Sequence, residues 1–163
     1  MIPELAAKRS AERSETYAGL SRAVAALLAG ERDLIANTAN FAALVYGALP
    51  GLNWAGWYFL RGEELVLGPF QGKPACVRIG LGRGVCGTAA RQRASVLVPD
   101  VHAFPGHIAC DSASRSELVV PALRADGTLL GVFDMDSPEL ARFNEQDQRG
   151  IEAAVRALVA GSD

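Results

Sequence analysis

The stretch ELVVPALRADGTLLGVFDMDS, residues 117–137, decides the fold class because it has the form of a β-hairpin. Two segments rich in valine, leucine and phenylalanine flank the turn ADG at residues 125–127. Apolar segments on either side of a glycine-containing turn are typical of paired antiparallel strands. A second hairpin is predicted upstream, where WAGWYFL (54–60) and ELVLGPF (64–70) flank the turn sequence RGE. A sheet assembled from hairpins is mostly antiparallel.

Three longer helices are predicted outside the hairpins. Residues 31–48 place apolar side chains at a spacing of three and four, and residues 14–29 form the helix before them. The segment 145–160 follows Asn144, a residue type that caps helices, and Phe143, which is placed to act as a hydrophobic staple. The remaining short elements are a strand at 75–79, a brief helix at 88–93 and a strand at 95–100.

This order of elements predicts an α+β domain. Two helices, about six short strands and a closing helix indicate a six-stranded, mostly antiparallel sheet with the helices gathered on one face. The 163 residues are enough for one domain with a substantial core. The sequence contains neither an internal repeat nor a linker that would divide it.

The charge and hydropathy of the chain argue against several classes of partner. A formal net charge of -2 and a pI of ≈ 5.7 disfavour a general binder of nucleic acid or of membrane surfaces. No apolar run reaches the ~18 residues of a membrane span, and the N-terminal residues lack the apolar region of a secretory signal. We therefore expect a cytoplasmic protein whose thiols are kept reduced.

The cysteines Cys76, Cys86 and Cys110 form an odd set that a structural disulfide framework would not produce. Metal binding, redox chemistry and simple burial stay open. His107 and Cys110 have an HxxC spacing, but structural zinc recruits cysteines in close pairs, which this chain lacks, so we predict no metal site. Cys110 lies in a loop over residues 101–116, and loops longer than ~12 residues in a compact domain are usually functional.

The segment GRGVCG (82–87) formally matches the GxGxxG fingerprint of dinucleotide-binding proteins. The predicted helix that follows has only about six residues, which is too short for the crossover of a βαβ unit. We therefore favour a glycine-rich turn and predict no cofactor. Cys86 would then lie near a helix N-terminus, a position that lowers the pKa of a cysteine.

Three carboxylates are predicted to meet beside the loop of Cys110. Asp134 and Asp136 are two residues apart on one strand, so both point to the same face, and Glu117 begins the strand paired with it. A solvated sheet edge is the simpler interpretation. However, three like charges raise at least one pKa, and such a cluster is better explained by a cationic ligand or by a protonated carboxylic acid that donates a proton.

Alternation along WAGWYF places Trp54 and Tyr58 on one face of a strand, and Trp57 and Phe59 on the other. Trp54 and Tyr58 are candidates for the core and equally for the wall of a small apolar pocket.

Four segments together resemble a known family. They are NWAGWYFL (53–60), LVLGPFQGKPACVRIGLGRGVCGTA (65–89), PDVHAFPGHIACDSASRSELVVP (99–121) and GVFDMDSP (131–138). They resemble the GAF-domain free methionine-(R)-sulfoxide reductases, and the resemblance extends from about Tyr17 to the final helix. It implies that residues 1–163 form a single GAF domain with a six-stranded antiparallel sheet flanked by helices.

The resemblance also implies roles for individual residues. In that family the cysteine of GHIACDSAS attacks the sulfoxide sulfur, which corresponds to Cys110, and the other two cysteines act in recycling, so Cys76 and Cys86 are the candidates for the resolving thiol. The residues that the resemblance assigns to substrate binding are Trp54, Tyr58, Glu117, Asp134 and Asp136. His102 and His107 are expected to shape the loop.

The implied reaction is the reduction of free methionine (R)-sulfoxide to methionine through a cysteine sulfenic acid and then an intramolecular disulfide. Thioredoxin is the expected reductant, and neither a metal nor a cofactor takes part. A homodimer and the preference for the R epimer are expectations from the resemblance alone. The alternative is a non-catalytic GAF sensor that binds a small ligand in the same pocket, which would need neither three cysteines nor three carboxylates.

Overall fold

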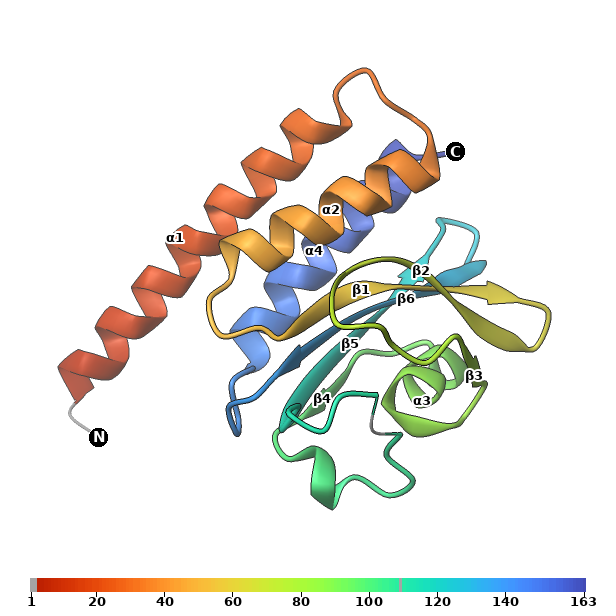
Figure 1. Cartoon of the computed structure of the whole chain (residues 1–163). Helices are drawn as coiled ribbons and strands as arrows, with labels where there is room; N and C mark the ends of the chain where they lie inside the picture. Colours follow the sequence, from red (N-terminus) through yellow and green to blue (C-terminus); the bar gives the residue numbers. More distant parts are fainter. Residues whose placement is uncertain (1–2, 109) are drawn as a thin grey trace.

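The structure is a computed structural model that describes residues 3–108 and 110–163 (Figure 1). Its strands form one sheet in the order β3-β2-β1-β6-β5-β4, and every neighbouring pair is antiparallel. The predicted six-stranded antiparallel sheet of an α+β fold is therefore confirmed. The elements in chain order are α1 (Pro3–Leu28), α2 (Leu34–Ala48), β1 (Trp54–Arg61), β2 (Glu64–Gly72), β3 (Arg78–Gly80), α3 (Gly84–Gln92), β4 (Val96–Val98), the 3-10 helix η1 (Val101–Ala103), β5 (Ser116–Leu123), β6 (Leu129–Ser137) and α4 (Glu145–Gly161).

Both predicted hairpins are present, and they join at the centre of the sheet, where β1 pairs with β6. In the β5–β6 turn, the N–H of Gly127 donates to the carbonyl of Arg124 at 2.9 Å, and Gly127 has a φ of 85°. Glycine adopts this left-handed conformation without a steric penalty. The turn thereby fixes the register that pairs the start of β5 with the end of β6.

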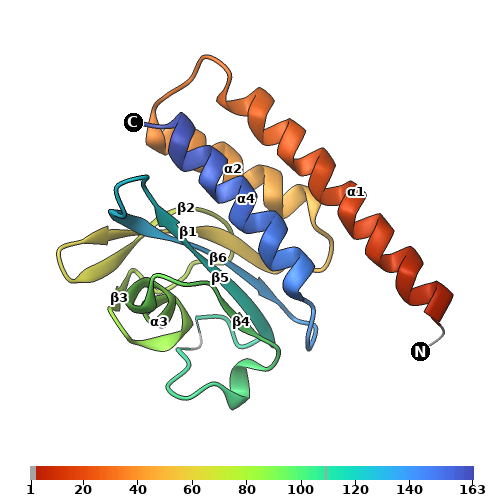
Figure 2. The ribbon, with the colours of Figure 1, turned by 180° about the vertical axis from the view of Figure 1, so that it is seen from behind.

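The helices cover both faces of the sheet rather than one (Figures 1 and 2). Helices α1, α2 and α4 pack on the face that carries Trp57 and Phe59, in one hydrophobic core. Helix α3 packs on the opposite face with Trp54 and Tyr58, in a second core. The prediction that the helices gather on one face is wrong, because both faces of the strands are apolar and each needs a covering layer.

The predicted alternation along β1 is confirmed by these two cores. Trp57 lies against the rings of Phe41 and Phe133, at centroid distances of 5.4 and 4.9 Å. Trp54 and Tyr58 instead face the layer that contains α3. One strand therefore supplies the structural core with one set of aromatic rings and the α3 side with the other.

Two helices begin earlier than predicted. Helix α1 starts at Pro3 instead of residue 14, because its first turns are polar and carry no apolar periodicity that would reveal a helix. Helix α3 starts at Gly84, so the second half of GRGVCG is the first turn of the helix and not a preceding loop.

The predicted N-cap of α4 is confirmed. The side chain of Asn144 accepts hydrogen bonds from the N–H groups of Gln146 and Asp147, and the Asp147 carboxylate accepts one from the Asn144 N–H in return. Asp147 also accepts a hydrogen bond from the hydroxyl of Tyr17 at 2.9 Å, which ties α1 to α4. Within the part of the chain described, none of the helices combines the length and hydrophobicity that a membrane crossing requires.

Candidate active site

A pocket lies on the α3 face of the sheet, between α3, the strand ends and the loop that contains Cys110. The resemblance implied eight catalytic or substrate-binding residues. Seven of them line the pocket, and the eighth, Cys76, is covalently joined to Cys110. The seven are Trp54, Tyr58, Cys86, Cys110, Glu117, Asp134 and Asp136. The structure therefore brings together residues that are spread over more than half of the chain.

The register of the sheet places the three carboxylates side by side. Glu117 on β5 is directly opposite Asp136 on β6, and Asp136 is in turn opposite Trp54 on β1. Asp134 lies two residues along β6, opposite Gly56. All three carboxylates face the same side because side chains alternate along a strand, so the predicted meeting of Glu117 with the two aspartates is confirmed.

Gly56 opposite Asp134 has a steric reason to be glycine. A Cβ at this position would lie 2.6 Å from the ring of Trp54 and 2.3 Å from Cβ of Phe70. The Trp54 ring stacks on Phe70, with centroids 5.4 Å apart and planes at 15°. The missing side chain therefore lets Trp54 lie flat across the sheet and form one wall of the pocket.

Trp54 and Tyr58 form this wall as a stacked pair, with ring centroids 5.9 Å apart. The indole N–H of Trp54 donates to the carbonyl of Lys73 at 3.1 Å, and the Tyr58 hydroxyl donates to the carbonyl of Cys76 at 3.0 Å. The two alternatives for these residues are thus both realised: they belong to the second core and also line the pocket.

Burial dominates the protonation of the carboxylates. It raises the pKa of Glu117, Asp134 and Asp136 well above the usual range, and repulsion within the cluster raises each further. A hydrogen bond from Ser114 opposes part of this effect at Asp136. Glu117 and Asp134 are only 5% and 6% exposed. The pocket therefore holds carboxylic acids that keep a proton at pH values where exposed carboxylates are ionised.

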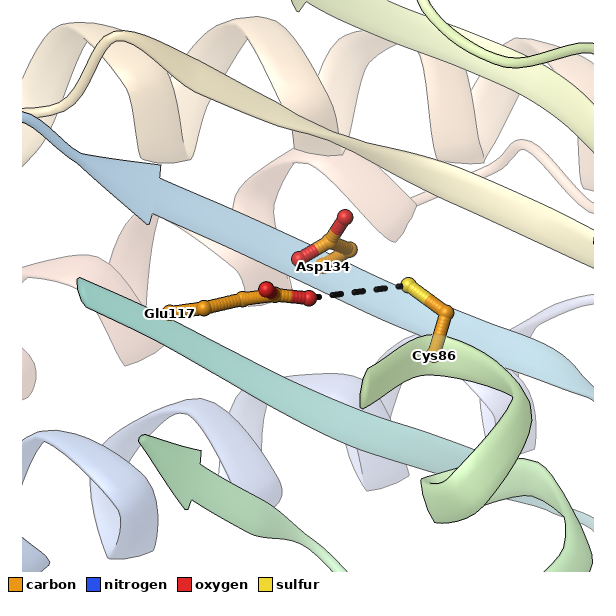
Figure 3. Close-up of side chains that lie close together, drawn as sticks. All are labelled: Cys86, Glu117 and Asp134. Atoms are coloured by element: carbon orange, nitrogen blue, oxygen red, sulfur yellow. Dashed lines mark hydrogen bonds between the residues drawn. The ribbon is translucent and has the colours of Figure 1, made fainter. Parts of the chain in front are cut away.

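Cys86 lies in the first turn of α3, beside two of these acids (Figure 3). Its thiol donates to Oε1 of Glu117 at 4.0 Å. The prediction that the helix N-terminus lowers the pKa of Cys86 is wrong. Burial raises that pKa well above its ordinary value, and the charges of Asp134 and Glu117 add to the effect. Desolvation and two neighbouring acids outweigh the helix dipole, which leaves Cys86 a neutral thiol.

Cys76 and Cys110 form a disulfide with their Cα atoms 5.7 Å apart, although 34 residues separate them in sequence. Cys110 is exposed and Cys76 is half-buried. Cys86 is a free and buried cysteine. The sequence left open which cysteine pairs with Cys110, and in the structure this partner is Cys76. The expectation that all thiols are reduced does not hold for this state of the protein.

A small polar network fixes the residue after Cys110. The amide of Asn53 donates to the Asp111 carboxylate at 3.3 Å and to the Ser114 hydroxyl at 3.0 Å, and Lys73 Nζ lies 3.4 Å from Asp111. The Asp111 carboxylate also accepts from the N–H of Ala113. Sequence reasoning missed these residues. The signal was available, because Asn53 adjoins Trp54 and Asp111 adjoins Cys110.

The two histidines of the loop differ in position. His107 lines the pocket, with Nε2 at 3.6 Å from Oε2 of Glu117, and burial lowers its pKa, which favours the neutral ring. His102 is exposed in η1 and lies outside the pocket. Arg83 also lines the pocket.

The sheet order and the pocket on the α3 face agree with a comparison against known families. The sequence model of the GAF domain matches residues 31–158. The chain belongs to the GAF-domain family, which confirms the resemblance drawn from the sequence.

Individual relatives narrow this assignment. The chain is 50% identical to the free methionine-R-sulfoxide reductase of Escherichia coli over 146 residues, which cover 90% of this chain and 88% of the relative. Its structure is similar to that of the free methionine-R-sulfoxide reductase from Neisseria meningitidis in complex with its substrate, with a TM-score of 0.83, 44% identity and coverage of 94% and 89% of the two chains. It is also similar to a proposed GAF sensor protein from Burkholderia vietnamiensis, with a TM-score of 0.89, 61% identity and coverage of 92% and 95%.

Proposed function

We propose that this protein reduces free methionine (R)-sulfoxide to methionine. The observation that carries the proposal is the Cys76–Cys110 disulfide, which lies beside a pocket of buried, protonated carboxylic acids. A disulfide between an exposed loop cysteine and a half-buried cysteine is the product expected when a sulfenic acid is resolved by a second thiol. The named reductases among the relatives support the same reaction.

In the proposed first step, the Cys110 thiolate attacks the electrophilic sulfur of the sulfoxide. The sulfoxide oxygen leaves only when it is protonated, and Glu117 or Asp134 supplies this proton as a buried acid. The protonated oxygen leaves as water from the adduct of Cys110 and the substrate sulfur. Water then attacks the Cys110 sulfur and breaks its bond to the substrate sulfur, which releases methionine and leaves Cys110 as a sulfenic acid. The Cys76 thiol then attacks the Cys110 sulfur, which expels the oxygen as water and forms the disulfide.

The polar groups of the pocket suit a free amino acid. Asp136, which lies opposite Trp54, is positioned to accept an ammonium group, which a methionine sulfoxide residue inside a peptide lacks. Lys73 and Arg83 line the same pocket and offer positive charge to an α-carboxylate. The stacked rings of Trp54 and Tyr58 provide an apolar wall for the methyl group.

Regeneration requires an external dithiol, and we assign this role to thioredoxin. Cys110 is the exposed sulfur of the pair, and thiol–disulfide exchange depends on access to the attacked sulfur. Two exposed apolar residues, Val77 and Ile108, are close in sequence to the two cysteines, at 63% and 37% exposure. They offer an apolar contact surface around the disulfide.

Three further parts of the proposal rest on the resemblance. They are the preference for the R epimer, a homodimeric assembly, and the organisation of residues 1–163 as a single GAF domain. The cytoplasmic location stays an expectation from the sequence.

The experiment that tests the function compares catalysis with simple binding. The full-length protein is incubated with dithiothreitol and with either epimer of free methionine sulfoxide, and methionine is quantified. The proposal predicts repeated turnover of the R epimer by the wild type and loss of turnover in Cys110→Ser. Saturable binding of the sulfoxide without methionine formation would instead favour the GAF sensor alternative, which the likeness to the proposed Burkholderia sensor supports.

A further inference from the structure

Cys86 has no part in the proposed reaction, although it is buried in the pocket. Its thiol points at two acids that come from other elements, Glu117 on β5 and Asp134 on β6 (Figure 3). One ligand atom from each of the three side chains lies within 4.8 Å of the others. A thiol and two carboxylates from three separate elements are thus held at nearly the mutual spacing of ligands around one ion.

A second observation at the same place points to a missing partner. Oδ1 of Asp134 is buried and accepts no hydrogen bond from any residue that the structure describes. Asp134 as a whole is only 6% exposed. Buried polar atoms are satisfied in most proteins, and one that is not needs an explanation; beside a thiol and a second acid, a bound ion supplies one.

We propose that Cys86, Glu117 and Asp134 bind a divalent transition-metal ion of the zinc class, with His107 as the fourth ligand. Zinc prefers thiolate, imidazole and carboxylate in a tetrahedral set, at about 2.0 to 2.3 Å from each ligand atom. His107 Nε2 is 3.6 Å from Oε2 of Glu117, next to the three-residue cluster. The sulfur ligand disfavours magnesium and calcium, which select oxygen.

The bound ion acts as an inhibitor and not as a cofactor. It occupies Glu117 and Asp134, the acids that the proposed reaction needs for the substrate, so zinc and methionine sulfoxide compete for the pocket. This consequence rests on the proposed function, whereas metal binding itself does not. Cys76 and Cys110 are not ligands, so the site exists equally when they are joined in the disulfide.

Cobalt(II) is the probe that tests the site directly, because thiolate ligation gives cobalt a charge-transfer band in the near ultraviolet. The chain contains 3 cysteines, and in the oxidised protein the disulfide leaves Cys86 as the free one. We expect one equivalent of cobalt to produce the band in oxidised wild type and one equivalent of zinc to remove it. Cys86→Ala should lose the band, and Asp134→Asn should weaken cobalt affinity at least about tenfold.

Asp111→Asn is the matched control, since it makes the same carboxylate-to-amide change at another residue of the pocket. It should bind cobalt as the wild type does. Near-ultraviolet circular dichroism checks that each variant is folded. If Cys86→Ala does not fold, Cys86→Ser and the near-isosteric Asp134→Asn are titrated with zinc against a chromophoric chelator instead.

Absence of the band in oxidised wild type would overturn the proposal, as would a band that survives in Cys86→Ala or an unchanged affinity in Asp134→Asn. The metal site and the proposed function fail independently. A cobalt band in a protein that releases no methionine leaves the site standing and refutes the reductase. Sulfoxide turnover in a protein without the cobalt band supports the reductase and refutes the metal site.

Discussion

Glu117 on β5 lies directly opposite Asp136 on β6. This pairing brings like charges together in a buried place, where antiparallel sheets normally avoid them. Burial and mutual repulsion hold the pKa of both groups above the usual range. The sheet itself thus creates the proton donor that sulfoxide reduction needs.

Replacing the Glu117 acid should slow the chemistry. Glu117→Gln cannot donate a proton to the sulfoxide oxygen, so kcat/KM should fall by about 10²–10⁴, the usual contribution of a general acid. In the wild type, kcat/KM should fall on the alkaline side, as pH rises through the raised pKa of this acid. Initial rates between pH 5 and about 10 measure both effects.

Glu145→Gln is the control for this prediction, because Glu145 is an exposed residue in the first turn of α4. It should leave the rate and the pH profile unchanged. An unaltered alkaline limb in Glu117→Gln would assign the titration to another group.

Asp134→Asn should stabilise the protein at alkaline pH. The pKa of Asp134 is raised in the folded state, so its stabilising contribution is complete below the ordinary pKa of about 3.9. That contribution is lost as pH rises through the folded pKa. The amide has no charge to bury, and we expect a Tm higher by roughly 2–4 °C at pH 8 for each 1 kcal/mol gained. Thermal unfolding at pH 4 and pH 8 gives the comparison.

Asp126→Asn, the same change at an exposed aspartate, should not stabilise the protein. Asp126 accepts a hydrogen bond from the N–H of Thr128, which lowers its pKa, so the carboxylate stabilises the fold above its unfolded pKa. A similar Tm increase at pH 8 in Asp126→Asn would refute the buried-acid explanation for Asp134.

The pairing with Cys76 predicts different products in the two cysteine variants. After a single turnover of the sulfoxide with no external thiol added, Cys76→Ser should retain a sulfenic acid on Cys110, which dimedone labels. Cys86→Ser should still form the Cys76–Cys110 disulfide, because Cys86 is outside the pair. Peptide mass spectrometry detects both the dimedone adduct of Cys110 and the disulfide. Persistent sulfenic acid in Cys86→Ser would make Cys86 the first resolving thiol.

Tyr58→Phe should slow disulfide formation by Cys76 and should lower the stability of the protein only slightly. The variant loses the hydrogen bond from the Tyr58 hydroxyl to the Cys76 carbonyl, at a cost of about 0.5–1.5 kcal/mol in unfolding free energy. Disulfide formation after sulfenic acid formation should slow, and stopped-flow measurement with a single equivalent of substrate tests this. Tyr46→Phe, at a partly exposed residue of α2, is the control and should not change that step.

The surface beside the disulfide should matter only to a protein reductant. Val77→Asp places a charge on an exposed apolar residue next to Cys76, so turnover with thioredoxin should fall several-fold while turnover with dithiothreitol is kept. Ile35→Asp makes a similar change at another exposed residue, on α2, which packs on the opposite face of the sheet. Equal losses in both variants would argue against a docking role for Val77.

The hairpins explain why much of the site could be predicted from the sequence. Alternation and a known turn determine which residues of two strands lie opposite each other, so Glu117 could be placed beside Asp134 and Asp136 without a structure. Alternation along β1 likewise places Trp54 and Trp57 on opposite faces of the sheet. Local rules of this kind apply because the partners belong to one hairpin or one strand.

The disulfide partner and the state of Cys86 could not be predicted in this way. Cys76 reaches Cys110 through the fold and not through sequence proximity, since Cys86 is nearer to Cys110 along the chain. The pKa of Cys86 depends on acids that two other elements bring to it. The helix dipole can be expected from the sequence, but the burial of Cys86 cannot, so the direction of its pKa shift was predicted wrongly.

A single turnover of fully reduced protein tests whether Cys110 and Cys76 carry out the reduction. One equivalent of free methionine (R)-sulfoxide is added without reductant, and methionine and the Cys76–Cys110 disulfide are quantified together by mass spectrometry. In wild type we expect methionine to form first and the disulfide to follow it in a 1:1 ratio, and neither should form in Cys110→Ser. Methionine release by Cys110→Ser, or a disulfide that appears without methionine, would contradict this expectation.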